Sequence, residues 1–225
     1  MNRRGAGGGV AAVKEALMRN GKVFILAVLA AFSAAAVAGD AARPRMTRER
    51  AEQIMADDGT AVLQDNLPVN LMNAKVDVVE ALLVLGLDPN GKLEQTPQTP
   101  LEFAVSACMD KRNAEADVLA TIAVLLREGA RPNEAGMLGA PLILAAQQCG
   151  PAVARQLIAG GAKLDARTPQ GFTPLSMALI VGNYDTAEAL VDAGATLSAE
   201  AAGKLREGAD GNERLMSLVK RATAK

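Results

Sequence analysis

The chain has 225 residues and contains no histidine and no tryptophan. The absence of histidine excludes Ser-His and Cys-His nucleophile pairs, the usual zinc sites and the commonest general base. The sequence also lacks a Gly-Lys-Ser/Thr phosphate loop, a Gly-x-Ser-x-Gly motif and any cluster of metal ligands. We therefore expect a protein that is not an enzyme, with no cofactor, no metal and no small-molecule substrate.

Aromatic residues are scarce at 2% of the chain, although half of all residues are apolar. Alanine, leucine and valine must therefore build the core, which suits helices that pack closely on one another. The net charge is only −1, so electrostatics gives no reason to expect a nucleic acid or an anionic membrane as partner.

One long uncharged apolar run stands near the N-terminus, at residues 23–38 (VFILAVLAAFSAAAVA). Basic residues precede it, and its last three residues, Ala-Val-Ala, have the small-x-small pattern that signal peptidase recognises. We therefore predict a signal peptide at residues 1–38, cleaved between Ala38 and Gly39.

Two alternatives to cleavage stay open: an uncleaved N-terminal membrane anchor and a buried core helix. The apolar run is slightly short for a membrane span, which needs about 20 residues. Initiation at Met18 instead of Met1 would still give a compact leader. Residues 1–38 hold five of the 24 basic and one of the 25 acidic residues, so cleavage would leave a moderately acidic protein with a net charge of −5.

The rest of the chain repeats itself every 32 or 33 residues from Gly129 onward, and the unit that begins at Pro100 is nine residues longer. A Pro-Leu pair that follows Thr or Ala can begin a helix, and it recurs at Pro100, Pro141 and Pro174. A glycine that can end a second helix recurs at Gly86, Gly129, Gly161 and Gly194. Each unit is a short helical hairpin too small to bury its apolar face alone, so the units must stack.

This pattern resembles the ankyrin-repeat family, whose 33-residue unit is a β-turn followed by two antiparallel helices with a T-P-L-H-x-A signature. The resemblance covers roughly residues 60–198. It implies an all-α, ankyrin-like helical-hairpin solenoid of about four repeats with helical N- and C-terminal caps. Glu102, Ile143 and Ser176 replace the signature histidine, so we expect the bracing that the imidazole gives to be absent.

The repeats and their flanks predict a domain organisation for the whole chain. The predicted segments are a signal peptide or anchor at 1–38, a linker at 39–46 and an ankyrin-repeat domain at 47–225. Within the domain we predict an N-terminal cap at 47–66, a degenerate repeat at 67–90, a repeat at 91–133 with an insertion at 109–117, repeats at 134–165 and 166–198, and a C-terminal cap at 199–225.

The only two cysteines, Cys108 and Cys149, each lie eight residues after the proline of their repeat. In an oxidising compartment such a pair suggests a disulfide. Packed helices stand roughly 8–10 Å apart, whereas bridged Cα atoms are at most about 7 Å apart. A bridge therefore requires converging helix ends, and two buried thiols stay an open alternative.

The resemblance implies that a partner binds the concave face, which is lined by turn tips and first helices. The implied contact residues are Gln95, Thr96, Gln98, Ser106, Ala107, Glu134, Met137, Gln147, Gln148, Arg167, Gln170, Phe172, Ile180 and Val181. Phe172, Ile180 and Val181 would expose apolar groups, as expected for a protein partner. The alternative is that they pack against a neighbouring turn or cap.

Taken together, these patterns predict a non-catalytic, exported bacterial protein that binds another protein in the periplasm. An inhibitor or immunity-type role and a scaffold role both fit. The alternative function is a membrane-anchored structural or scaffold protein of the cell envelope, held in the inner membrane by an uncleaved leader and facing the periplasm.

Overall fold

The computed structural model describes residues 44–93, 96–136 and 139–223. The predicted leader, its cleavage site at Ala38–Gly39, and the predicted contact residues Gln95 and Met137 lie outside the described residues. Within the described ranges, no helix combines the length and the apolar character needed to cross a membrane.

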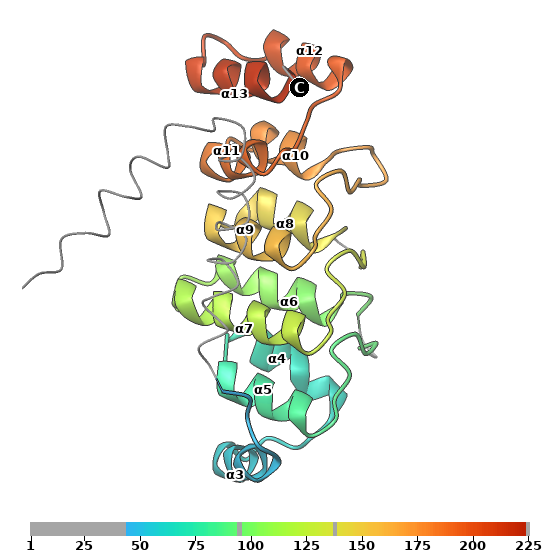
Figure 1. The fold of residues 1–225 in the computed structure, drawn as a ribbon, viewed down its shortest axis with the longest axis vertical. Coiled ribbons are helices and arrows are strands. Elements are labelled where there is room, and N and C mark those ends of the chain that lie inside the picture. The colour runs from blue at the N-terminus through green and yellow to red at the C-terminus, as the bar shows by residue number, and fades with distance from the viewer. Residues whose placement is uncertain (1–43, 94–95, 137–138, 224–225) are drawn as a thin grey trace, which may run out of the picture. The chain divides into compact units, whose positions relative to one another are not determined.

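The described residues form helical hairpins that stack in chain order, with their turn loops on one side (Figure 1). The elements are α3 (Arg48–Asp58), η1 (Gln64–Asn66), α4 (Leu67–Met72), α5 (Val76–Val84), α6 (Pro100–Ser106), η2 (Ala107–Met109), α7 (Glu115–Arg127), α8 (Pro141–Gln148), α9 (Pro151–Ala159), α10 (Pro174–Ile180), α11 (Tyr184–Asp192), α12 (Ala199–Glu207) and α13 (Glu213–Thr223). First helices α4, α6, α8 and α10 pack on one another in that order, as do second helices α5, α7, α9 and α11. The predicted helical-hairpin solenoid is confirmed.

Each predicted Pro-Leu pair begins a first helix, since Pro100, Pro141 and Pro174 open α6, α8 and α10. Proline is suited to this position because the first turn of a helix leaves its N–H groups without an intrahelical acceptor. The degenerate repeat departs only slightly from this pattern: α4 begins at Leu67, and its proline, Pro68, stands one residue later.

The starts of α6 and α10 are braced although the signature histidine is missing. The Thr99 N–H donates to Glu102 Oε2 over 2.7 Å, and the Glu102 N–H donates back to Thr99 Oγ1 over 3.2 Å. Thr173 and Ser176 exchange the same two bonds at 2.8 and 3.2 Å. Each pair is a capping box, so other side chains brace the starts of α6 and α10 where the imidazole is absent. At α8, whose N-cap is Ala140, no side chain caps the helix start.

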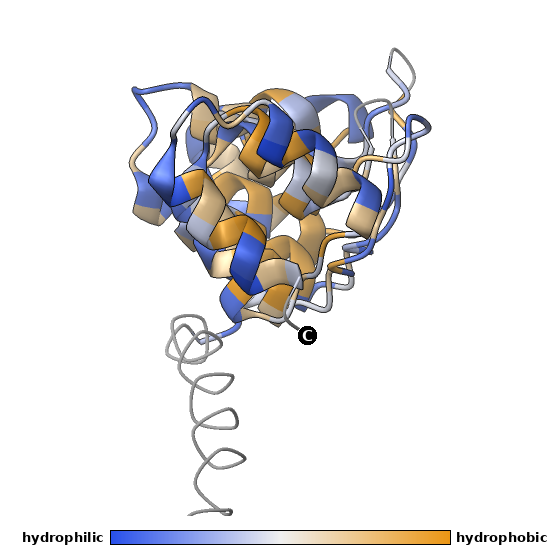
Figure 2. Ribbon diagram, turned by 90° about the horizontal axis from the view of Figure 1, so that it is seen from above, coloured by the Kyte–Doolittle hydropathy of each residue, from blue (hydrophilic) through white to orange (hydrophobic). Residues whose placement is uncertain are grey.

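Leucine and isoleucine side chains fill the space between the hairpins. The largest fully buried side chains are Leu67, Leu71, Leu82, Leu101, Ile122, Leu125, Leu142, Ile143, Leu144, Leu157, Leu175 and Leu190. Viewed along the stack in Figure 2, hydrophobic residues lie mostly where the helices face one another, and hydrophilic residues occupy the outside. No hairpin encloses its own core, so the hairpins depend on their neighbours for burial.

The predicted insertion at 109–117 is only partly a loop. Helix α7 has 13 residues, whereas α5, α9 and α11 have nine each. The additional turn of α7 takes up the last residues of the insertion, because Glu115 and Asp117 favour the positive end of a helix. The remaining residues form the end of η2 and a loop that leads to Ala114.

The two predicted caps close the ends of the stack. At the N-terminal end, α3 packs on α5, and the Thr47 hydroxyl accepts from the Arg50 N–H. At the C-terminal end, α13 packs on α11 with its buried apolar face, and ion pairs between exposed side chains also join the two helices. These pairs join Arg214 to Asp185 at 2.5 Å and Arg221 to Glu188 and Asp192 at 3.0 and 2.6 Å.

Gly203 in the C-terminal cap offers a stabilising substitution. It lies inside α12, its φ is outside the left-handed region, and a Cβ at this position would meet no atom within 4 Å. Glycine in a helix interior is less favourable than alanine by about 1 kcal/mol. We therefore expect Gly203→Ala to raise the free energy of unfolding by about 0.5–1 kcal/mol, measured by urea denaturation. Gly136→Ala is the control with the opposite expected effect: it should lower the free energy of unfolding, because its Cβ would lie 2.8 Å from the Pro97 carbonyl oxygen.

Asparagine side chains link the turn loops of successive repeats. The Asn90 side chain donates to the Gly129 carbonyl over 2.9 Å and accepts from the Arg131 N–H over 2.8 Å. Asn133 makes the same two bonds, to the Gly161 carbonyl and from the Lys163 N–H, at 2.9 and 2.8 Å. Both bonds cross from one repeat to the next, so each asparagine fixes the spacing of two turn loops.

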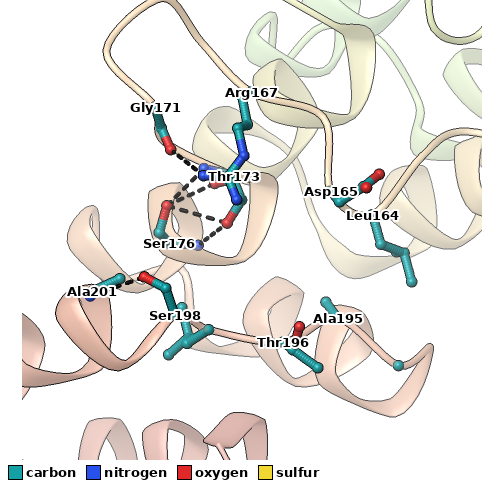
Figure 3. A pocket seen from close by; sticks show the side chains of 12 residues that line it. Leu164, Asp165, Arg167, Gly171, Thr173, Ser176, Ala195, Thr196, Ser198 and Ala201 are labelled. Carbon is teal, nitrogen blue, oxygen red and sulfur yellow. Dashed lines mark hydrogen bonds between the residues drawn. The ribbon is translucent and has the colours of Figure 1, made fainter.

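The third equivalent residue is Asp165, and the corresponding place holds a cavity of about 340 Å³ (Figure 3). Its carboxylate has no hydrogen to donate to the Gly194 carbonyl, which also lines this cavity together with Thr196. We expect Asp165→Asn to form the missing link and to raise the free energy of unfolding by about 1 kcal/mol. Urea denaturation measures this, and Asn133→Ala should lower the same quantity by a similar amount.

Candidate binding surface

The first helices end in a row of solvent-accessible side chains. Equivalent residues stand at the C-terminal ends of α4, α6, α8 and α10, six and seven residues after Pro100, Pro141 and Pro174 and after the equivalent position 66 of the degenerate repeat. They lie side by side because these helices pack in order. We name the accessible members of this row the inner-helix stripe, which consists of Met72, Asn73, Ser106, Gln147, Gln148, Ile180 and Val181. Ala107 occupies an equivalent position but is buried, so its predicted contact role is wrong.

Side-chain hydrogen bonds tie the ends of neighbouring first helices together behind the stripe. The Asn113 side chain donates to the Met72 and Ala107 carbonyls over 2.8 and 2.9 Å, which joins α4 to the end of α6. The Asn183 side chain donates to the Ala146 and Cys149 carbonyls over 3.1 and 2.8 Å, which joins the loop after α10 to α8.

A disulfide between Cys108 and Cys149 makes the intervening link, from α6–η2 to α8, with the Cα atoms 5.7 Å apart. The predicted bridge is present, and the alternative of two free thiols does not hold. Cys108 lies in η2 and Cys149 is the C-cap of α8, so the bridge joins helix ends that converge more closely than helix axes do. The stripe therefore has a covalent or hydrogen-bonded link at each of its three repeat boundaries.

The apolar residues predicted to face a partner are exposed. Ile180 and Val181 at the end of α10 expose 53% and 44% of their surface, and Phe172 in the last turn loop exposes 39%. Their exposure contradicts the alternative that they are packed away beneath a turn or cap. Within that turn, the Thr168 hydroxyl accepts from the Phe172 N–H over 3.1 Å, which fixes the backbone that carries the ring.

The other predicted contact residues of the turn loops are less uniform. Arg167 donates to the Gly171 carbonyl over 3.2 Å and so supports its own turn, as Figure 3 shows. Gln170 is exposed, whereas Gln98 is half-buried and its N–H donates to Thr96 Oγ1 over 3.2 Å. Glu134, also half-buried, pairs with Arg131 at 3.2 Å. These side chains belong to separate turn loops and do not form one row, unlike those of the inner-helix stripe.

Sequence reasoning missed an apolar group at the N-terminal end of the stripe. Val69, Met72 and Met109 expose 55%, 48% and 59% of their surface. Asn113 bonds to both the Met72 and the Ala107 carbonyls, which holds the end of α4 close to the start of η2, the element that carries Met109. The available signal was the register: with Leu67 equivalent to Leu175, Met72 corresponds to Ile180.

In the inserted loop beside this group, two of the charges, those of Asp110 and Arg112, compensate one another. The Arg112 guanidinium donates to both carboxylate oxygens of Asp110, at 2.6 to 3.0 Å. These bonds, together with the Arg112 N–H, lower the pKa of Asp110 from 3.8 to about 2. The carboxylate is therefore ionised and paired with Arg112 at any ordinary pH, so the two residues add no net charge beside the stripe.

The described residues contain no group of three or more Asp, Glu or Cys side chains placed to hold a metal ion. The cavity in Figure 3, between the last turn loop and α12, is lined largely by backbone and small side chains such as Thr173, Thr196 and Ala201. A second cavity, of about 190 Å³, lies beside Cys108. The stripe, in contrast, places uncharged accessible side chains at the ends of four successive first helices, and it suits contact with a macromolecule.

Stacked helical hairpins with an accessible row of first-helix side chains define a repeat solenoid of the kind that binds other molecules along its length. A family model described as ankyrin repeats (three copies) matches residues 112–201, so this part of the chain consists of ankyrin repeats. No curated protein matches the chain. Ankyrin repeats mark a protein–protein interaction module and are typically a non-catalytic scaffold.

Proposed function

We propose that this protein is a non-catalytic adaptor that binds one partner protein through its concave face, with the inner-helix stripe as the main contact. The observation that carries the proposal is the row itself: accessible side chains stand at the same position of successive helices, and apolar ones are exposed at both ends. Exposed apolar groups gathered in one region mark protein contacts far more often than scattered ones.

The structure supports this role through rigidity as well as exposure. Asn113, the Cys108–Cys149 bridge and Asn183 hold successive helix ends in register. A surface that is already fixed loses little conformational entropy when a partner binds. A rigid surface of this kind suits an adaptor that recognises one partner protein rather than many.

We further propose that the protein is exported and acts in a bacterial periplasm, with residues 1–38 removed. Cys108 and Cys149 support an oxidising compartment, because structural disulfides persist there. Mass spectrometry of the N-terminus tests this. A protein that begins at Gly39 supports export with cleavage, whereas a protein that begins upstream of Val23 supports the membrane-anchored scaffold.

Affinity capture from a cell-envelope extract tests the binding role. The protein, tagged at its C-terminus, should retain a partner that the Ile180→Asp variant loses, because a charge at this position must be desolvated in the contact. Met216→Asp is the matched control, since Met216 is also exposed, at 40%, but lies on α13 away from the stripe. Equal capture by the wild type and Ile180→Asp contradicts the proposed face. The captured partner also separates the two roles: inhibition of a toxin or enzyme indicates an inhibitor, and its stabilisation indicates a scaffold.

A further inference from the structure

The chemistry of the inner-helix stripe specifies what kind of segment it binds. We propose that the partner contributes an extended, uncharged segment with apolar side chains near both ends and its backbone amide groups against Gln147 and Gln148. This inference rests on the proposed function and adds the nature of the partner's contact.

Charge is the first argument. Charged residues make up 22% of the chain, yet none of the seven stripe residues is charged. In the inserted loop, Asp110 and Arg112 bind each other, and Lys111 between them is exposed. A charged side chain of a partner placed over the stripe itself would lose its hydration without gaining an opposite charge from the seven stripe residues, which is unfavourable. An uncharged segment avoids this cost.

The distribution of apolar side chains is the second argument. Met72 lies at one end of the stripe and Ile180 at the other, and three helix-to-helix steps separate them. At roughly 8–10 Å for each step, these side chains stand about 24–30 Å apart. An extended chain rises about 3.3 Å for each residue, so apolar residues about eight positions apart reach both ends.

The two central glutamines are the third argument, and they distinguish an extended chain from a helix. Gln147 and Gln148 are exposed, and neither side chain hydrogen-bonds to another of the described residues. Each amide offers two donors and an acceptor oxygen. An extended segment presents N–H and C=O groups that need partners, whereas a helix has already paired most of its own. The glutamine pair therefore fits an extended backbone.

Selection from a displayed library of random peptides of about 12 residues tests the proposal, because such peptides are long enough to span the stripe when extended. The bait is the wild-type protein, purified from the cells that naturally produce it and in the form in which they produce it. We expect the selected peptides to be uncharged in their central part and to carry apolar residues about eight positions apart. Their affinity should change less than about twofold between roughly 50 and 500 mM salt, because contacts without charge are not screened.

Substitutions in the inner-helix stripe test whether the selected peptides bind there. Met72→Asp and Ile180→Asp should each weaken binding of the selected peptides at least about tenfold, and Gln147→Ala with Gln148→Ala should weaken it as well. Met216→Asp, away from the stripe, should leave their affinity unchanged. Circular dichroism of each variant confirms that the fold is retained.

Three results would overturn the inference. These are selected peptides that bind through charge and lose affinity steeply with salt, peptides that bind the aspartate variants as well as the wild type, and no selected peptide at all. Capture of a folded partner that depends on Ile180 would then still support the proposed function, so the two conclusions fail separately.

Discussion

Replacing Cys108 and Cys149 together with alanine should lower the free energy of unfolding by about 4 kcal/mol. The bridge joins residues 41 positions apart, and closing a loop of this length removes roughly that much conformational entropy from the unfolded chain. The link also joins two repeats that share a core, so its loss should loosen the middle of the stack more than its ends. Urea denaturation measures the free energy, and hydrogen exchange in α6 and α8 shows where protection is lost.

A reductant provides the control for this prediction. Reducing the wild type should bring its denaturation midpoint close to that of the double-alanine variant, and the same reductant should leave the variant unchanged. A wild type whose midpoint does not respond to complete reduction, verified by thiol labelling, would contradict the assigned stabilisation. The comparison also separates the effect of the bond from the effect of losing two sulfur atoms inside the core.

Arg127→Ala should lower the free energy of unfolding by about 3 kcal/mol or more. The Arg127 guanidinium lies 2.7 Å from Glu80 Oε1, and only 16% and 3% of the two side chains are exposed. Removing the arginine deprives a buried carboxylate of this guanidinium, and breaking one side of a buried pair typically costs about 3–5 kcal/mol. Glu80→Ala should cost less, because Arg127 also pairs with Glu128 at 2.9 Å.

A double variant distinguishes the cost of leaving Glu80 without this guanidinium from the net value of the pair. Replacing Glu80 and Arg127 together with leucine and methionine should recover most of the lost stability, since apolar side chains of similar volume often replace a buried pair without loss. Lys204→Ala is the exposed control: its pair with Glu200 is 73% and 78% exposed, so water screens the interaction and no measurable change is expected. A double variant as unstable as Arg127→Ala would show that the pair itself is stabilising.

Much of the fold could be predicted because the helix boundaries are local. Thr47, Pro100 and Pro174 act on the first turn that they begin, and the closing glycines permit the left-handed backbone that ends a helix, as at Gly194 with φ of 103°. These signals recur in each unit, including the one lengthened by the insertion, so the number of hairpins and their order follow from the sequence. The bracing by Glu102 and Ser176 lies outside the family signature, but it follows a local rule, since a capping box needs a threonine or serine at the N-cap and an acceptor at the third helical position.

The candidate binding surface could be predicted only in part. Ser106, Gln147, Ile180 and Val181 were found from their positions in the repeat. Met109 was not found, because it follows the regular part of α6 and its place depends on how the inserted residues divide between the loop and α7. Equivalence in sequence identifies which residues share a row, but it does not give their accessibility, as the buried Ala107 shows.

The sequence by itself determined the repeat, the helix starts and the pairing of helices into hairpins, because these depend on residues a few positions apart. Tertiary structure decided whether Cys108 could reach Cys149, which asparagines link turn loops, and that Glu80 and Arg127 meet inside the stack. Each of these contacts joins different repeats. Their distances depend on the packing of whole helices, which no local pattern specifies.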